Sequence, residues 1–120
     1  KKLVDLANSK NTKTVILGLP SRSSVDKDEW KKIKAQGHNV NEKLYENPAS
    51  YREFLSMCKS QSFECLDLYN TIKTNQKAES LFMEEDNHFN PGGNQLIADA
   101  LLKYLISNSY VNSEGKYESK

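Results

Sequence analysis

The chain has 120 residues, and its 17 Lys and Arg against 16 Asp and Glu leave a net charge of +1. This length suits one small domain, and the near-neutral balance gives no reason to expect nucleic acid or an anionic membrane as a partner. No apolar run exceeds four residues, which excludes a membrane-spanning helix. The chain opens on Lys1 rather than Met, within residues typical of a helix, so we expect it to be a piece of a longer protein.

Apolar spacing and turn residues predict alternating helices and strands. The expected elements are, in chain order, a helix from residue 3 to about 8–11, a strand over 14–19, a helix over 26–35, a helix over 48–59, a strand over 63–68, a short helix over 69–75 and a helix over 91–106. Residues 107–120 are polar and aperiodic, which predicts a flexible tail.

Polar residues before three of these helices are candidate N-caps. Ser23 or Ser24 is expected to cap the helix over 26–35, and Asn47 the next long helix, which has a proline in its first turn. Asn90 is expected to cap the last helix, where a proline again occupies the first helical position.

The strand over 14–19 carries three consecutive aliphatic residues, Val15 to Leu17, which is typical of a strand covered on both faces in a parallel sheet. The order of elements is that of an α/β fold with a parallel sheet and right-handed crossovers. Two strands leave unpaired sheet edges. We therefore expect further strands outside this chain or from another copy, and self-association of the isolated chain.

Two cysteines, Cys58 and Cys65, have six residues between them, a spacing that fits no common zinc pattern. One falls near the end of a predicted helix and the other on the following strand, so a disulfide between them is geometrically conceivable. Because free cysteines are commonly buried, two buried thiols are the favoured interpretation.

Asp86 and His88 are the main candidates for chemistry. They lie two residues apart, so in an extended loop both side chains point the same way. A carboxylate there can accept the Nδ1–H of the imidazole and leave Nε2 free to take a proton from a nucleophile. The alternative is a loop hydrogen bond without a catalytic role.

A metal site is a second interpretation of the same segment. Glu84, Glu85, Asp86 and His88 offer oxygen and imidazole ligands within five residues. A zinc or iron site needs a further well-spaced ligand, and the chain's one other histidine is His38. We therefore expect no metal and no other cofactor.

Other polar residues follow the predicted strands. Ser21, Ser23 and Ser24 come just after the first strand and could approach His88, but no tight glycine turn surrounds them, so turn and cap roles are favoured. Asp67 ends the second strand and is expected to bond a neighbouring turn.

The block Asp86-Asn87-His88-Phe89-Asn90-Pro91, followed by two glycines and an apolar helix, resembles the C-terminal block of SGNH (GDSL-type) hydrolases. The resemblance spans about residues 1–106 and is specific over 81–105. It implies a flavodoxin-like three-layer α/β/α fold, with His88 as base and Asp86 as acid. Glu85 is the alternative acid, because many members place the acid three residues before the histidine and others place it two before, as Asp86 would be.

The same resemblance implies that residues 1–106 are the C-terminal portion of one such domain, whose Gly-Asp-Ser, oxyanion-glycine and Gly-x-Asn-Asp blocks precede Lys1. The implied activity is ester hydrolysis or acyl transfer on a small-molecule or saccharide ester, with a serine nucleophile outside this chain. The alternative function is a non-catalytic α/β module that binds a ligand or partner at the ends of the strands.

Overall fold

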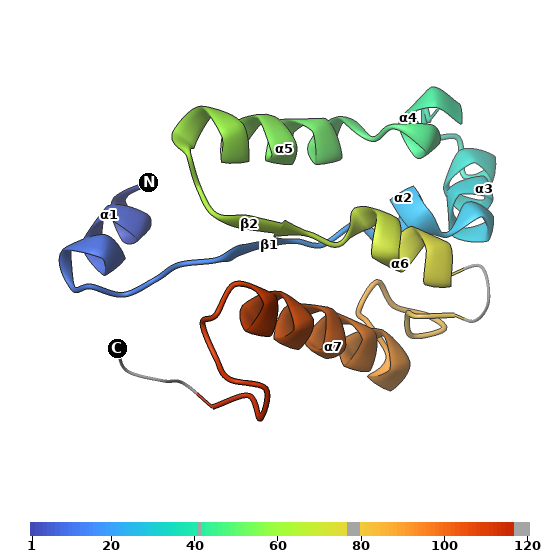
Figure 1. The fold of residues 1–120 in the computed structure, drawn as a ribbon. Coiled ribbons are helices and arrows are strands. Elements are labelled where there is room, and N and C mark those ends of the chain that lie inside the picture. Colours follow the sequence, from blue (N-terminus) through green and yellow to red (C-terminus); the bar gives the residue numbers. More distant parts are fainter. Residues whose placement is uncertain (41, 77–79, 117–120) are drawn as a thin grey trace. The chain divides into compact units, whose positions relative to one another are not determined.

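The computed structural model describes residues 1–40, 42–76 and 80–116 (Figure 1). Its elements are α1 (Lys2–Ser9), β1 (Ile16–Gly18), α2 (Arg22–Val25), α3 (Lys27–Ala35), α4 (Glu42–Glu46), α5 (Ala49–Gln61), β2 (Cys65–Asp67), α6 (Tyr69–Asn75) and α7 (Pro91–Ser107). The chain divides into two compact units, unit 1 (residues 1–70) and unit 2 (residues 71–120).

The two strands of unit 1 form a parallel sheet, with Ile16 opposite Cys65 and Gly18 opposite Asp67. The predicted α/β class with a parallel sheet is thereby confirmed. The strands are shorter than expected, and all their residues are half-buried. The aliphatic run of β1 predicted a fully buried strand, whereas its residues are half-buried in the structure.

Helix α5 runs along the sheet of unit 1 (Figure 1). Gly18 allows this approach, since a Cβ on that residue would lie 2.4 Å from the ring of Phe54 on α5. The aromatic ring fills the volume that a side chain on β1 would need. A side chain at Gly18 would therefore require the Phe54 ring to move.

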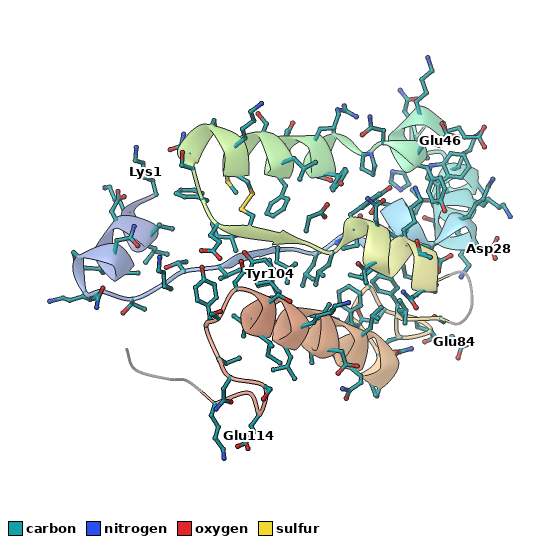
Figure 2. All side chains as sticks on the ribbon, in the orientation of Figure 1. Lys1, Asp28, Glu46, Glu84, Tyr104 and Glu114 are labelled. Atoms are coloured by element: carbon teal, nitrogen blue, oxygen red, sulfur yellow. A yellow bond between two sulfur atoms is a disulfide. The ribbon has the colours of Figure 1, made fainter. Side chains whose placement is uncertain are left out.

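A disulfide joins Cys58 on α5 to Cys65 on β2, with their Cα atoms 6.1 Å apart (Figure 2). The favoured interpretation of two thiols is therefore wrong. The cause is the turn between the two elements, where Ser62 adopts φ +52° and reverses the chain so that the two cysteines meet. Closing this short loop restricts the unfolded chain and contributes about 2 kcal/mol to stability.

The helix starts correct two predicted caps. Asp26, rather than Ser23 or Ser24, caps α3, and its carboxylate accepts two backbone N–H groups of the first turn. Pro48 occupies the N-cap position of α5, so Asn47 lies one residue further out. The competing carboxylate explains the first error, because an ionised acceptor at a helix N-terminus is favoured by the helix dipole.

Buried apolar side chains occur in both units. The most buried apolar side chains are Val25, Trp30, Leu68 and Tyr69 in unit 1, and Ile72, Leu81 and Phe82 in unit 2. Phe82 is part of the hairpin that carries the candidate active site described below, so the base of that hairpin is packed.

Candidate active site

The segment before α7 folds back on itself as a short hairpin in unit 2. Phe82 and Phe89 form an antiparallel bridge, and their rings stack with centroids 4.5 Å apart. The backbone N–H of Met83 donates to the carbonyl oxygen of His88 at 2.9 Å. The hairpin presents residues 84–88 at its tip, where Glu84 is labelled in Figure 2. The extended loop expected from the sequence is thus a turn.

Asp86 and His88 meet within this turn. The Oδ1 atom of Asp86 lies 2.6 Å from Nδ1 of His88 and also accepts the backbone N–H of His88 at 3.1 Å. A carboxylate that bonds the backbone two residues onward is the usual way an aspartate shapes a turn, and here it also brings the side chains together. With a proton on Nδ1, the lone pair of Nε2 is left available as an acceptor.

The contact keeps Asp86 in its ionised form. The hydrogen bond from the His88 ring, followed by that from the His88 backbone, lowers the pKa of Asp86 below its ordinary value. A lowered pKa in the folded state means that the contact stabilises the turn at pH values above the pKa that Asp86 has in the unfolded chain. This stabilisation is lost as the pH falls through the pKa of Asp86 in the folded protein. His88 is 84% exposed and Asp86 54%, so a reactant can reach the imidazole.

Asn90 ties the hairpin to the start of α7. Its side-chain oxygen accepts the N–H of Gly93 at 2.9 Å, which is the predicted cap. Its amide nitrogen also donates to the carbonyl oxygens of Ser80 at 2.8 Å and Phe82 at 3.3 Å. Gly93 is buried, and a Cβ there would lie 2.2 Å from the carbonyl oxygen of Leu81. Backbone therefore packs on backbone beneath the hairpin.

We expect Gly93→Ala to destabilise the protein by about 1–3 kcal/mol, because its methyl group would clash with the Leu81 carbonyl. Gly92→Ala is the matched control: its Cβ meets the Asn90 side chain only at 3.3 Å, and both substitutions gain the same helix propensity. Urea unfolding of the two variants measures the difference. Equal stabilities would contradict the close packing of α7 on the hairpin.

Glu85 and His38, the other candidate residues, are not part of the contact between Asp86 and His88. Glu85 is exposed, and the imidazole bonds Asp86 in the part of the chain that the structure describes. His38 is exposed in the loop after α3, in unit 1. Within residues 1–40, 42–76 and 80–116, no three His, Cys, Asp or Glu side chains gather as a potential metal site.

The polar residues after the strands form local turns in unit 1. The Ser24 hydroxyl donates to the carbonyl oxygen of Ser21 at 2.7 Å, and the hydroxyls of Ser21 and Ser23 lie 3.3 Å apart. Asp67 accepts the backbone N–H of Tyr69 at 2.9 Å. Ser24 and Asp67 therefore bond neighbouring turns, as expected.

Residues 1–118, which include the sheet, the helices and the hairpin, match a protein family described as "SGNH hydrolase-like domain, acetyltransferase AlgX". The protein belongs to this SGNH hydrolase-like family. No curated protein and no solved structure matches the chain.

Membership of the SGNH hydrolase-like family confirms the resemblance found in the sequence, and the match extends beyond residue 106. It places the domain in the general class of SGNH-type acyl esterases and acyltransferases. Among the helices of the described residues, none has the length and apolar character needed to span a bilayer.

Two features of this SGNH hydrolase-like domain were missed by sequence reasoning. The first is the Phe82–Phe89 pair that closes the hairpin. The second is the double role of Asn90, which bonds the hairpin as well as capping α7. Aromatic residues on either side of a polar tip are the one signal that could have indicated the hairpin, because such pairs stabilise facing strands.

Proposed function

We propose that Asp86 and His88 are the acid and base of an SGNH-type serine acyl-ester hydrolase or acyltransferase. The observation that carries the proposal is the 2.6 Å contact between the Asp86 carboxylate and Nδ1 of His88. The exposure of the imidazole supports it, because Nε2 must reach a nucleophile. The nucleophile in this proposal is a serine outside residues 1–120.

In the proposed reaction, Nε2 of His88 takes the proton of the serine hydroxyl while the serine oxygen attacks the ester carbonyl carbon. The imidazolium then gives this proton to the leaving alcohol as the ester C–O bond breaks, and an acyl-enzyme forms. Water or an acceptor hydroxyl repeats the sequence and releases the acyl group. Asp86 stays ionised throughout, accepts the Nδ1–H and stabilises the imidazolium.

The proposed substrates are small-molecule or saccharide esters. The family description names an acetyltransferase, which favours an acetyl group as the one transferred. The position of His88 at an exposed hairpin tip suits a substrate too large to enter a closed cavity. The proposed chemistry uses protein side chains and water or an acceptor alcohol, without a cofactor.

The test is hydrolysis of 4-nitrophenyl acetate by the full-length protein, with and without a saccharide acceptor, together with labelling by a serine-directed sulfonyl fluoride. We expect turnover above the enzyme-free rate and one labelled serine per protein. The absence of both turnover and labelling would refute the catalytic proposal and favour a non-catalytic binding module.

A further inference from the structure

The ladder of the hairpin in unit 2 fixes which residue lies opposite His88. Phe82 and Phe89 form the antiparallel bridge. One step closer to the tip, the backbone N–H of Met83 donates to the carbonyl oxygen of His88 at 2.9 Å. Residues that follow and precede a bridged antiparallel pair face each other in the next position of the ladder. Met83 is therefore the cross-strand neighbour of His88.

The exposure of these side chains alternates along both arms of the hairpin. Phe82 is 2% exposed and Phe89 is half-buried, whereas Met83 is 48% exposed and the His88 side chain 84%. Successive side chains of an extended segment point to opposite faces, so the stacked rings form one face and Met83 and His88 form the other. Cross-strand neighbours on one face are close enough to contact the same ligand.

The proposed reaction determines which part of the ester lies on this exposed face. The imidazolium of His88 gives its proton to the leaving oxygen, so that oxygen must come within about 3 Å of Nε2. The atoms bonded to the leaving oxygen belong to the alcohol part of the ester, whereas the acyl group becomes bonded to the serine. The alcohol part is therefore the part nearest to His88 and to its neighbour Met83.

We infer that Met83 is a specificity-determining residue that contacts the alcohol part of the ester and favours alcohols with an apolar or aromatic face beside the ester oxygen. This inference rests on the proposed function. The thioether chain of methionine is flexible and polarisable, and it packs well against aromatic rings. Residues 84–87 of the tip carry only carboxylate and amide side chains, so Met83 supplies the apolar surface beside the base.

The test compares two acetates that share the acyl group and differ in the alcohol, 1-naphthyl acetate and 2,2,2-trifluoroethyl acetate, as substrates of the full-length protein. Met83→Gln keeps the length of the side chain and replaces the thioether by an amide. We expect it to lower kcat/KM about tenfold for the naphthyl ester and less than about twofold for the trifluoroethyl ester. Met83→Leu keeps an apolar side chain and should stay within about twofold of the parent protein on both esters.

Met57→Gln is the matched control, because Met57 is the other methionine of the chain, is 38% exposed and lies on α5 in unit 1. It should leave kcat/KM for both acetates unchanged. A third ester, 1-naphthyl butyrate, changes the acyl group at a constant alcohol. The effect of Met83→Gln on this butyrate should equal its effect on the naphthyl acetate.

The inference alone is overturned if the parent protein is active and Met83→Gln lowers kcat/KM equally for both acetates, because a uniform loss means that the variant acts by displacing His88. It is also overturned if Met83→Gln has no effect, if its effect follows the acyl group, or if Met83→Leu loses as much as Met83→Gln. A parent protein that hydrolyses none of these esters and is not labelled by the sulfonyl fluoride would refute the proposed function and this inference together.

Discussion

Replacing His88 with alanine is expected to lower kcat for ester hydrolysis by about 10⁴- to 10⁶-fold. The substitution removes the proposed proton acceptor, and no other side chain of the turn presents an imidazole to the nucleophile. The chain offers a matched control in His38, its one other histidine, which is exposed in unit 1. His38→Ala should change kcat by less than about twofold, since nothing in the proposed mechanism uses it.

The loss in His88→Ala should be catalytic rather than structural. The side chain is 84% exposed, so its removal leaves no cavity in the core. We expect the urea midpoint of the variant to match that of the parent protein. If both histidine variants retain activity, His88 is not the base.

Asp86→Asn and Glu85→Gln form the second comparison, because each replaces one neighbouring carboxylate by its amide. Asp86→Asn is expected to lower kcat by about 10⁴-fold, since the amide can donate where the carboxylate accepts and so favours the wrong imidazole tautomer. Glu85→Gln should cost less than about tenfold, because the imidazole bonds Asp86 in the described turn. The same nitrophenyl acetate assay measures both.

The reverse order of effects would be decisive against the assignment. If Glu85→Gln cripples turnover and Asp86→Asn is mild, Glu85 is the acid and the hairpin tip rearranges in the active protein. If both are mild, the Asp86–His88 contact is a structural feature of the turn alone.

Local signals predicted the parts of the fold that depend on neighbouring residues. The Asn90 cap with Pro91 at the first helical position located the start of α7, and the bounds of α6 over 69–75 agree with those of the structure. Cap choice failed where two acceptors compete, as at Asp26 against the serines before it. Helix α4 was not expected at all, because five residues carry too short a pattern to be periodic.

Features that depend on the path of a turn could not be predicted from the sequence. The Cys58–Cys65 disulfide requires the left-handed turn at Ser62, and a single chain pattern does not show that the two cysteines then meet. At the candidate active site the residue pair was correctly brought together, but by a turn instead of an extended loop.

The protonation of the His88 ring tests the central claim most directly, because the claim is that Asp86 holds the proton on Nδ1 and leaves Nε2 as the acceptor. Long-range ¹H–¹⁵N spectra, recorded at a pH where the imidazole is neutral, distinguish the two nitrogens without requiring turnover. We predict that Nδ1 carries the proton in the parent protein and that Asp86→Asn shifts the population toward the Nε2–H form, while Glu85→Gln does not. A His88 ring protonated on Nε2 in the parent protein, or one that responds to Glu85→Gln instead, would contradict the assignment of Asp86 and His88 as acid and base.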